Sequence, residues 1–223
     1  MSKIKATTSE RIDALMERAE SALQNTDYFT AESVAASALD LAHRGLDYDR
    51  MARILMPLEE ARRQKRLLAA DAGFTGRMTT LPGDDWPDRP GCWLVEPPRV
   101  GADARELRLR ADERRVPAIV ICREPETDSG AWPIVAIGVK TVRTTIAPPS
   151  GNTPSPSWFV EAAEALGDAA INSVDPARPP ASRVDNLMAV LQTLRDHDRL
   201  HQALVDACRA ALRAEGTPTR RAG

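Results

Sequence analysis

The stretch Pro117-Ala118-Ile119-Val120-Ile121-Cys122 decides the fold that we predict for this chain. Its apolar residues are continuous and largely β-branched, which is typical of a strand covered on both faces. A helix is predicted before it, from about Asp103 to Arg115, because acids at its start and arginines at its end complement the helix dipole. The apolar run Cys92–Val95 predicts the preceding strand, and Pro133–Thr145 predicts the following one, with a bulge at Gly138.

This order of elements predicts a small mixed sheet of three strands. The first two strands are expected to pair in parallel through the crossover helix, and the last to pair antiparallel. The glycine- and proline-rich stretch 73–90 is predicted to be a linker or a surface loop and to mark a domain boundary. The predicted fold class is therefore α+β, with a helical region over 1–75, a strand–helix–strand–strand segment over 76–150, and C-terminal helices over 151–223 that pack on the preceding parts.

The first 75 residues carry helical patterns. Thr7 and Glu10, three residues apart, predict a capping box that starts the first helix. A second helix is predicted from about Thr30 to Gly45. Pro57 lies inside the apolar stripe of a third helix. Because proline lacks an amide donor and crowds the preceding turn, we expect a kink or a restart there.

Part of this region resembles the tetratricopeptide repeat. The resemblance lies in Asp27-Tyr28-Phe29-Thr30-Ala31, in Ala38-Leu39-Asp40-Leu41 and in Ala19, which are similar to the family's second helix and its small packing residue. It covers about one repeat unit, residues 12–45, and departs from the family at Leu15, where the repeat has Trp. Since stable solenoids stack about three units, the resemblance implies at most a repeat-like helical hairpin, with a generic αα-hairpin as the alternative.

If this resemblance holds, it implies that the first helix presents a partner-binding face. That face consists of Asp13, Met16, Glu20 and Gln24. Because the face is acidic, a cationic ligand is implied, and the expected partner is another protein.

The last 40 residues carry two apolar stripes. The stripe that begins at Val184 and the one that begins at Leu200 differ in direction by roughly 145° on a continuous helix. One straight helix cannot turn both toward a single core, so we predict a break near Asp196 to Asp198. Because neither Gly nor Pro occurs there, one continuous helix over 181–215, buried on two sides, stays open as the alternative.

Composition excludes several classes of protein. Of the 223 residues, 43% are apolar and 28% are charged, with a net charge of −2, so a disordered chain is excluded and a general nucleic-acid binder is disfavoured. No apolar run approaches the ~20 residues that a bilayer span needs, and no secretory signal is recognised. Three scattered cysteines predict reduced thiols in the cytoplasm.

Two histidines four residues apart, His197 and His201, have the spacing of helical metal ligands. The motif resembles the zincin HExxH sequence with Asp198 in place of Glu. That shorter carboxylate would not reach a metal-bound water in the same way, and the predicted break would separate the two rings. We therefore favour a solvated cluster at a helix end and predict no metal.

Two further patterns offer alternatives. Glu96, Cys122 and Glu124 follow or end parallel strands, where α/β sheets place ligands, although a core cysteine is the favoured interpretation of Cys122. The densest basic run, Arg62–Arg66, follows two glutamates and favours a solvated helix face with intrahelical ion pairs over a nucleic-acid contact.

The predicted function is that of a non-catalytic intracellular interaction or adaptor protein without a cofactor. Enzymatic activity is left open but disfavoured, because no convergent catalytic set is visible. The first alternative is a small-molecule enzyme or ligand-binding module centred on the middle segment. The second is a weak nucleic-acid binder that uses the Arg62–Arg66 face.

Overall fold

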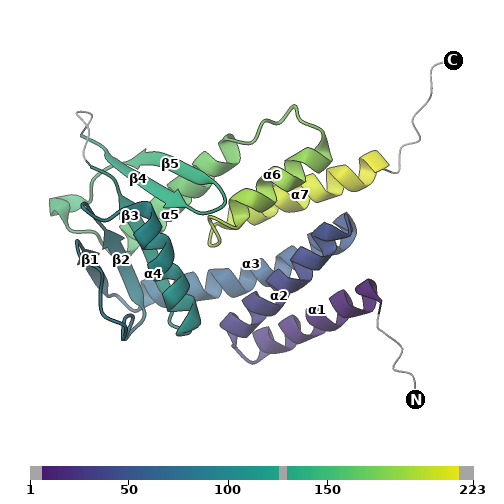
Figure 1. The fold of residues 1–223 in the computed structure, drawn as a ribbon, viewed down its shortest axis with the longest axis horizontal. Coiled ribbons are helices and arrows are strands. Elements are labelled where there is room, and N and C mark those ends of the chain that lie inside the picture. Colours follow the sequence, from purple (N-terminus) through teal and green to yellow (C-terminus); the bar gives the residue numbers. More distant parts are fainter. Residues whose placement is uncertain (1–6, 126–129, 216–223) are drawn as a thin grey trace.

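The computed structural model describes residues 7–125 and 130–215 (Figure 1). The described helices are α1 (Thr8–Gln24), α2 (Tyr28–Arg44), α3 (Tyr48–Asp71), α4 (Gly101–Glu113), α5 (Pro156–Asn172), α6 (Pro180–Leu191) and α7 (Asp198–Glu215). The described strands are β1 (Thr75–Met78), β2 (Gly91–Val95), β3 (Ala118–Arg123), β4 (Trp132–Ile137) and β5 (Thr141–Ile146). This mixture of helices with one mixed sheet confirms the predicted α+β class.

The sheet has the order β1-β2-β3-β4-β5. As predicted, β2 and β3 pair in parallel across α4, and the strands that follow pair antiparallel. The prediction of three strands is wrong in two places. The supposed linker contains β1, which pairs in parallel with β2. Residues 133–145 form two strands, because Gly138 donates its N–H to the Lys140 carbonyl at 3.0 Å and turns the chain back on itself.

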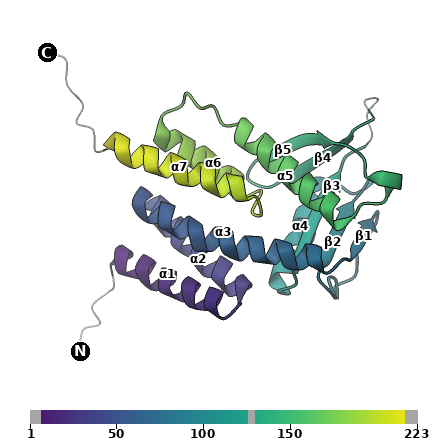
Figure 2. The ribbon, with the colours of Figure 1, turned by 180° about the vertical axis from the view of Figure 1, so that it is seen from behind.

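Helices cover both faces of the sheet. In Figure 1, α4 lies in front of the strands, and Figure 2 shows α5 and the end of α3 against the opposite face. Trp93, Val95 and Cys122 pack beneath α4, whereas Leu94 and Ile121 point into the larger core on the side of α3 and α5. The continuous apolar pattern of β3 thus has the predicted cause, a helix layer on each side.

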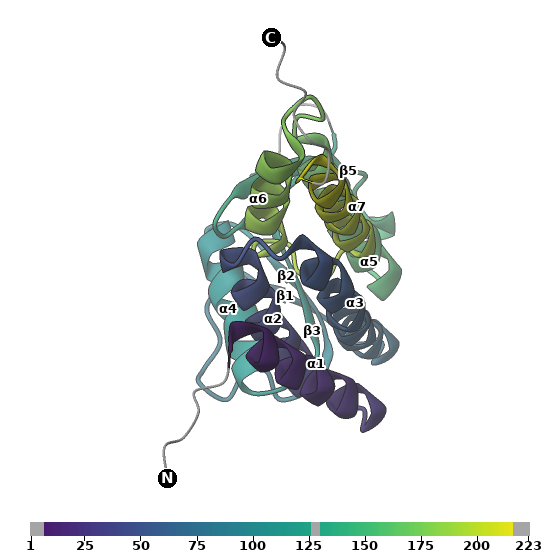
Figure 3. The ribbon, with the colours of Figure 1, turned by 90° about the vertical axis from the view of Figure 1, so that its right-hand side faces the viewer.

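The N-terminal helices α1, α2 and α3 pack side by side (Figure 3). The capping box is confirmed: Thr7 Oγ1 accepts from the Glu10 N–H, and Glu10 Oε2 accepts from the Thr7 N–H at 2.7 Å. Both interhelical turns have the same form, in which the N–H of Asp27 or Asp47 donates to a carbonyl five residues earlier and its side chain caps the next helix. The kinship with the tetratricopeptide repeat stays a prediction.

Helix α3 runs through Pro57 as one helix of 24 residues, so, of the expected kink or restart, the restart is wrong. The reason is packing on both sides of the proline. Leu55 before it and Leu58 after it are fully buried in the same core, which keeps the chain helical on both sides of the proline despite the missing amide donor.

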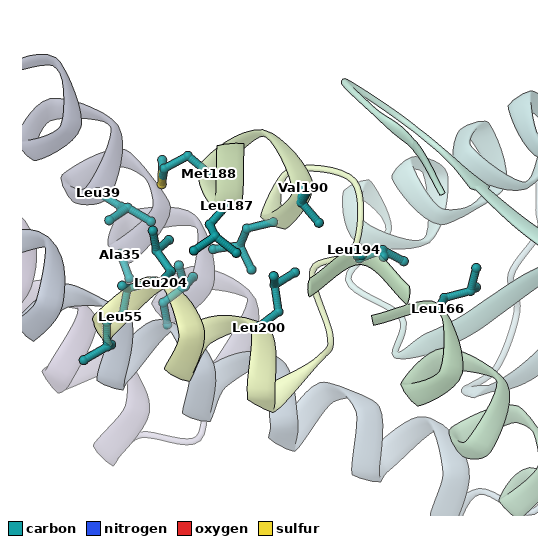
Figure 4. Packing of buried hydrophobic residues seen from close by; sticks show 14 of the residues in the cluster. Ala35, Leu39, Leu55, Leu166, Leu187, Met188, Val190, Leu194, Leu200 and Leu204 are labelled. Atoms are coloured by element: carbon teal, nitrogen blue, oxygen red, sulfur yellow. The ribbon is translucent and has the colours of Figure 1, made fainter. Parts of the chain in front are cut away.

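The C-terminal break is confirmed. Helix α6 ends at Leu191 and α7 begins at Asp198, and the connection changes the direction of the chain. Figure 4 shows the consequence: Leu187 of α6 and Leu204 of α7 approach the same group of side chains, near Leu55 of α3. Both apolar stripes therefore reach one core. Among the described residues, none of the helices combines the length and apolar character needed to cross a bilayer.

Gly167 of α5 offers a test of this packing. A Cβ atom at Gly167 would lie 2.1 Å from the ring of His197 in the α6–α7 connection. We expect Gly167→Ala to lower the free energy of unfolding by about 1–3 kcal/mol, because the buried ring has no room to move away. Gly45→Ala is the matched control, since its Cβ would meet nothing closer than 3.6 Å. Urea titrations that find equal stabilities for the two variants would contradict the packing described for α5.

Candidate functional site

Glu96 and Cys122 lie at the carboxyl ends of the neighbouring strands β2 and β3, as the sequence predicted. The carboxylates at these strand ends, however, are bound by arginines. Arg77 donates to both oxygens of the buried Glu96 carboxylate at 2.6 Å, and Arg143 pairs with Glu124 at 3.0 Å. Burial raises the pKa of the Cys122 thiol to about 12, so it stays protonated at neutral pH. Within the described residues, both carboxylates at this end of the sheet are therefore engaged by arginines.

His197 and His201 serve the fold. The Leu200 N–H donates to His197 Nδ1 at 3.1 Å, so His197 caps α7. The His201 Nδ1–H donates to the His197 carbonyl, and Arg62 Nη1 donates to His201 Nε2 at 3.1 Å. The prediction of a solvated cluster is wrong, because both rings are buried. No group of three His, Cys, Asp or Glu that could hold a metal occurs in residues 7–125 and 130–215.

The four residues of the predicted α1 face remain a candidate surface. Asp13, Glu20 and Gln24 are exposed and Met16 is partly buried. Asp13, however, is held by Arg50 of α3, which donates to its two oxygens at 3.1 and 3.2 Å. Its charge is therefore already paired within the protein.

The basic run on α3 is buried, so the expected solvated face is wrong. The solvent-exposed fraction is only 6% for Arg62, 8% for Lys65 and 9% for Arg66. The reason lies in tertiary contacts: α3 passes between other elements, each of which turns a carboxylate or a carbonyl toward it. These side chains are engaged inside the molecule and do not offer a cationic surface to nucleic acid.

The central group of these contacts joins three helices. Glu32 of α2 accepts from Arg62 at 2.9 Å and from Lys65 at 2.6 Å. Lys65 also pairs with Asp112 of α4 at 2.5 Å, and Asp112 accepts from Arg195 of the α6–α7 connection at 3.0 Å. We call these five residues the Glu32–Asp112 network. It connects the N-terminal helices, the sheet layer and the C-terminal helices at one place.

The ionisation of this network follows from its pairing. Burial acts to raise the pKa of Glu32, but Arg62 and Lys65 outweigh it and lower that pKa to about 2. Burial acts to lower the pKa of Lys65, but Glu32 and Asp112 outweigh it and raise that pKa. Both groups are therefore charged at neutral pH, and each depends on the other for compensation.

A second set of contacts fixes α3 against α7. Arg63 and Arg66 both donate to Asp198, at 3.1 and 3.0 Å, and the Gln202 side chain donates to Glu59 at 2.7 Å. Burial raises the pKa of Glu59, with Arg63 opposing it. The whole charged stripe of α3 is thus used in holding the molecule together.

Beside the Glu32–Asp112 network lies an open groove of about 670 Å³. It is bounded by α2, α4 and α6, which lie around the same side of the molecule (Figure 3), and by α3 and the β4–β5 turn. Its basic residues are Arg62, Lys65, Arg105, Arg108, Arg115 and Arg195, and its acidic residues are Glu32, Asp40, Asp112 and Glu113. Its large apolar residues are Phe29, Leu39, Leu58, Leu109, Val139, Met188 and Leu191.

The groove combines fixed and available cations. Lys65 Nζ lies 4.1 Å from the centre of the Phe29 ring, and Arg115 pairs with Asp27, so both are held in place. Arg105 is exposed and forms no hydrogen bond or ion pair with the described residues. The groove therefore offers apolar contact together with positive charge, which suits a ligand that is partly apolar and negatively charged.

The spacing of the basic residues along α3 indicated that they would be buried, although their charges suggested a solvent-exposed face. Arg62 and Lys65 lie four and seven residues after Leu58, so they continue the apolar face of α3. The groove itself was missed because its walls come from residues far apart in the chain. Asp112, for example, is 47 positions from Lys65.

The network predicts a strong effect of neutralising Glu32. Glu32→Gln should lower the free energy of unfolding by about 3 kcal/mol, because Arg62 and Lys65 lose a buried counter-charge. Glu60→Gln is the control, since its side chain pairs with Arg63 at the surface and should change stability by about 0.5 kcal/mol or less. Chemical denaturation of both variants at pH 7 measures the difference, and equal losses would contradict the network.

Protonation of His201 should destabilise the protein. Burial, reinforced by Arg62, lowers the pKa of His201 from 6.5 to about 3. Below pH 6.5 the unfolded chain therefore takes up a proton that the folded protein excludes. The contribution of His201 to the free energy of unfolding is fully present above pH 6.5. It falls by about 1.4 kcal/mol per pH unit as the pH drops toward 3. The loss between pH 6.5 and 5 should be clearly smaller in His201→Gln, where the lowered pKa of the buried His197 still contributes; an undiminished loss in that variant would rule out His201 as a source.

Comparisons with known proteins complete the description of the site. The chain matches no protein-family model, no curated protein and no solved structure. Function must therefore be inferred from the chemistry of the residues that the fold brings together.

Proposed function

We propose that this chain is a non-catalytic interaction protein that holds a segment of another protein in the groove between α2, α4 and α6. The observation that carries the proposal is the groove itself: about 670 Å³ of open space with aliphatic and basic walls. Its walls are mostly helices, and its floor rests on the Glu32–Asp112 network. A preformed surface of this kind binds without paying for much ordering of its own.

The ionisation of the reactive side chains favours binding over catalysis. Burial raises the pKa of Cys92, Cys122 and Cys208 to about 12, and the pKa of His201 is lowered to about 3. A general acid or base works best with a pKa near the working pH, and these groups lie far from it. Three buried cysteines without a disulfide are consistent with a reducing compartment, and the proposal includes a cytoplasmic location.

The mixed charge of the groove favours a protein segment over nucleic acid. Asp40, Asp112 and Glu113 lie among the arginines and would repel a continuous phosphate backbone. A peptide can present one acidic group to the cations and apolar side chains to Leu39 and Met188. The groove is also a better candidate than the α1 face, where Arg50 already neutralises Asp13.

A small anionic molecule is the second candidate ligand. The volume of the groove lies within the range of about 300–1,000 Å³ that is usual for small-molecule sites. This alternative moves the predicted ligand-binding module from the strand ends, where Glu96 and Glu124 pair with arginines, to the surface of α4.

Selection of peptides tests the proposal. A random 12-residue phage library is panned on the wild-type protein, and synthetic versions of the selected peptides are titrated against two variants. Val139→Glu adds a negative charge in the groove, whereas Met56→Glu makes the same change at an equally exposed apolar residue of α3 outside it (63% and 67% exposed). We expect the peptides to be rich in acidic and aliphatic residues and to bind Val139→Glu about tenfold more weakly. Binding to Met56→Glu should equal that of the wild type.

A third variant, Asp13→Lys with Glu20→Lys, separates the groove from the α1 face. If this variant lost peptide binding while Val139→Glu bound as the wild type does, the groove would be rejected as the binding site and the α1 face would be supported instead. Failure to select any peptide would contradict the proposed function.

A further inference from the structure

Arg108 of α4 is a buried guanidinium with incomplete pairing. It lines the groove and also the two small spaces beneath it, of about 40 and 10 Å³. Its Nη2 donates to the Thr193 carbonyl at 2.9 Å, while its buried Nε has no hydrogen-bond acceptor among the residues described. Its Nη1 forms no hydrogen bond with that part of the chain and is not among the buried atoms. The Nη1 amino group of Arg108 is therefore available to a ligand.

The charges around Arg108 do not neutralise it by direct contact. Within residues 7–125 and 130–215, no carboxylate lies within 4.0 Å of its guanidinium. The acids whose charges act on Arg108 are Asp196, Asp112 and Glu32, while the charge of Arg195 opposes them. Asp112 and Glu32 are already shared between other cations, and burial disfavours the charged form of Asp196 itself.

A guanidinium in this position calls for an oxyanion from outside. Arginine stays charged at neutral pH, and a charge that is removed from water without a partner costs free energy. An anion that reaches Arg108 from the groove would supply the missing partner by accepting a charge-assisted hydrogen bond from the Nη1 group. Arg105, one turn earlier on α4 and also lining the groove, adds a second cation that no described residue engages.

We propose that Arg108 is the anchor for a carboxylate of the bound segment, an Asp or Glu side chain flanked by aliphatic residues, with Arg105 beside it. This inference rests on the proposed function, because it names the chemistry of the ligand in the same groove. Carboxylate is favoured over phosphate because Asp40, Asp112 and Glu113 also line the groove, and a dianion would be repelled more strongly than a monoanion. The aliphatic residues of the bound segment would contact Leu39, Val139 and Met188 of the groove.

Small probes test the anchor without knowledge of the partner. The buried Nε–H of Arg108 is followed by NMR and assigned from its loss in Arg108→Gln. Sodium hexanoate, neutral hexanamide and inorganic phosphate are titrated at constant ionic strength. We expect hexanoate to shift this signal saturably and to bind about tenfold more tightly than hexanamide or phosphate. Equal binding of hexanamide would reject an anion site, and tighter binding of phosphate would reject the choice of carboxylate.

Matched variants complete the test, with amide-backbone shifts of groove residues as the common readout. Arg108→Gln should abolish hexanoate binding, and the exposed Arg105→Gln should weaken it about threefold without affecting folding. Arg110→Gln, on the same helix but outside the groove, should bind as wild type. If Arg108→Gln does not fold, Arg108→Lys replaces it, because lysine keeps the positive charge but lacks the planar guanidinium. Undiminished hexanoate binding in both Arg108→Lys and Arg105→Gln would show that Arg108 is not the anchor.

The outcomes also separate this inference from the function on which it rests. Hexanoate binding through Arg108 in a protein that selects no peptides would support the anchor and reject the protein partner. Selected peptides that bind Arg108→Gln as tightly as wild type would support the groove and reject the anchor.

Discussion

The contact between Lys65 and its two carboxylates, Glu32 and Asp112, is the interaction on which the arrangement of the molecule depends. It joins α2 of the helical layer to α4 of the sheet layer through a single ammonium group on α3. Charges buried in this way are stable only when their pairing is nearly complete, so the three helices are held in one relative position. The groove lies beside this network and is lined by α2, α3 and α4, with α6 and the β4–β5 turn forming the remaining walls.

The parts of the fold that were predictable are those set by local pattern. The continuous apolar run of β3 required two covering layers, and the rotation between two apolar stripes required a break before α7. The parts that were missed depend on tertiary contact. β1 has only four residues, and its pairing with β2 could not be read from Thr75–Met78 alone. The buried state of Arg62 and Lys65 could not be read from their charges, because the carboxylates that make it possible lie on α2 and α4.

The same reasoning explains why the chemically suggestive residues of the sequence lead away from catalysis. His197 and His201 cap and brace α7, Glu96 is held by Arg77 at the sheet edge, and the basic run of α3 is internal. The fold uses these groups to hold itself together. The cations that remain for a ligand, Arg105 and Arg108, belong to a helix that the sequence described only as a crossover. The role proposed for them depends on the groove that α4 lines together with α2 and α6.

A double-mutant cycle between Lys65 and Asp112 tests this account most directly. Unfolding free energies are measured for Lys65→Met, Asp112→Asn, the double variant and the wild type. If the two side chains hold the layers together, the two losses should be strongly non-additive, with a coupling energy of about 1.5 kcal/mol or more. A coupling below about 0.5 kcal/mol would mean that they act independently, and the central role given to their contact would be wrong.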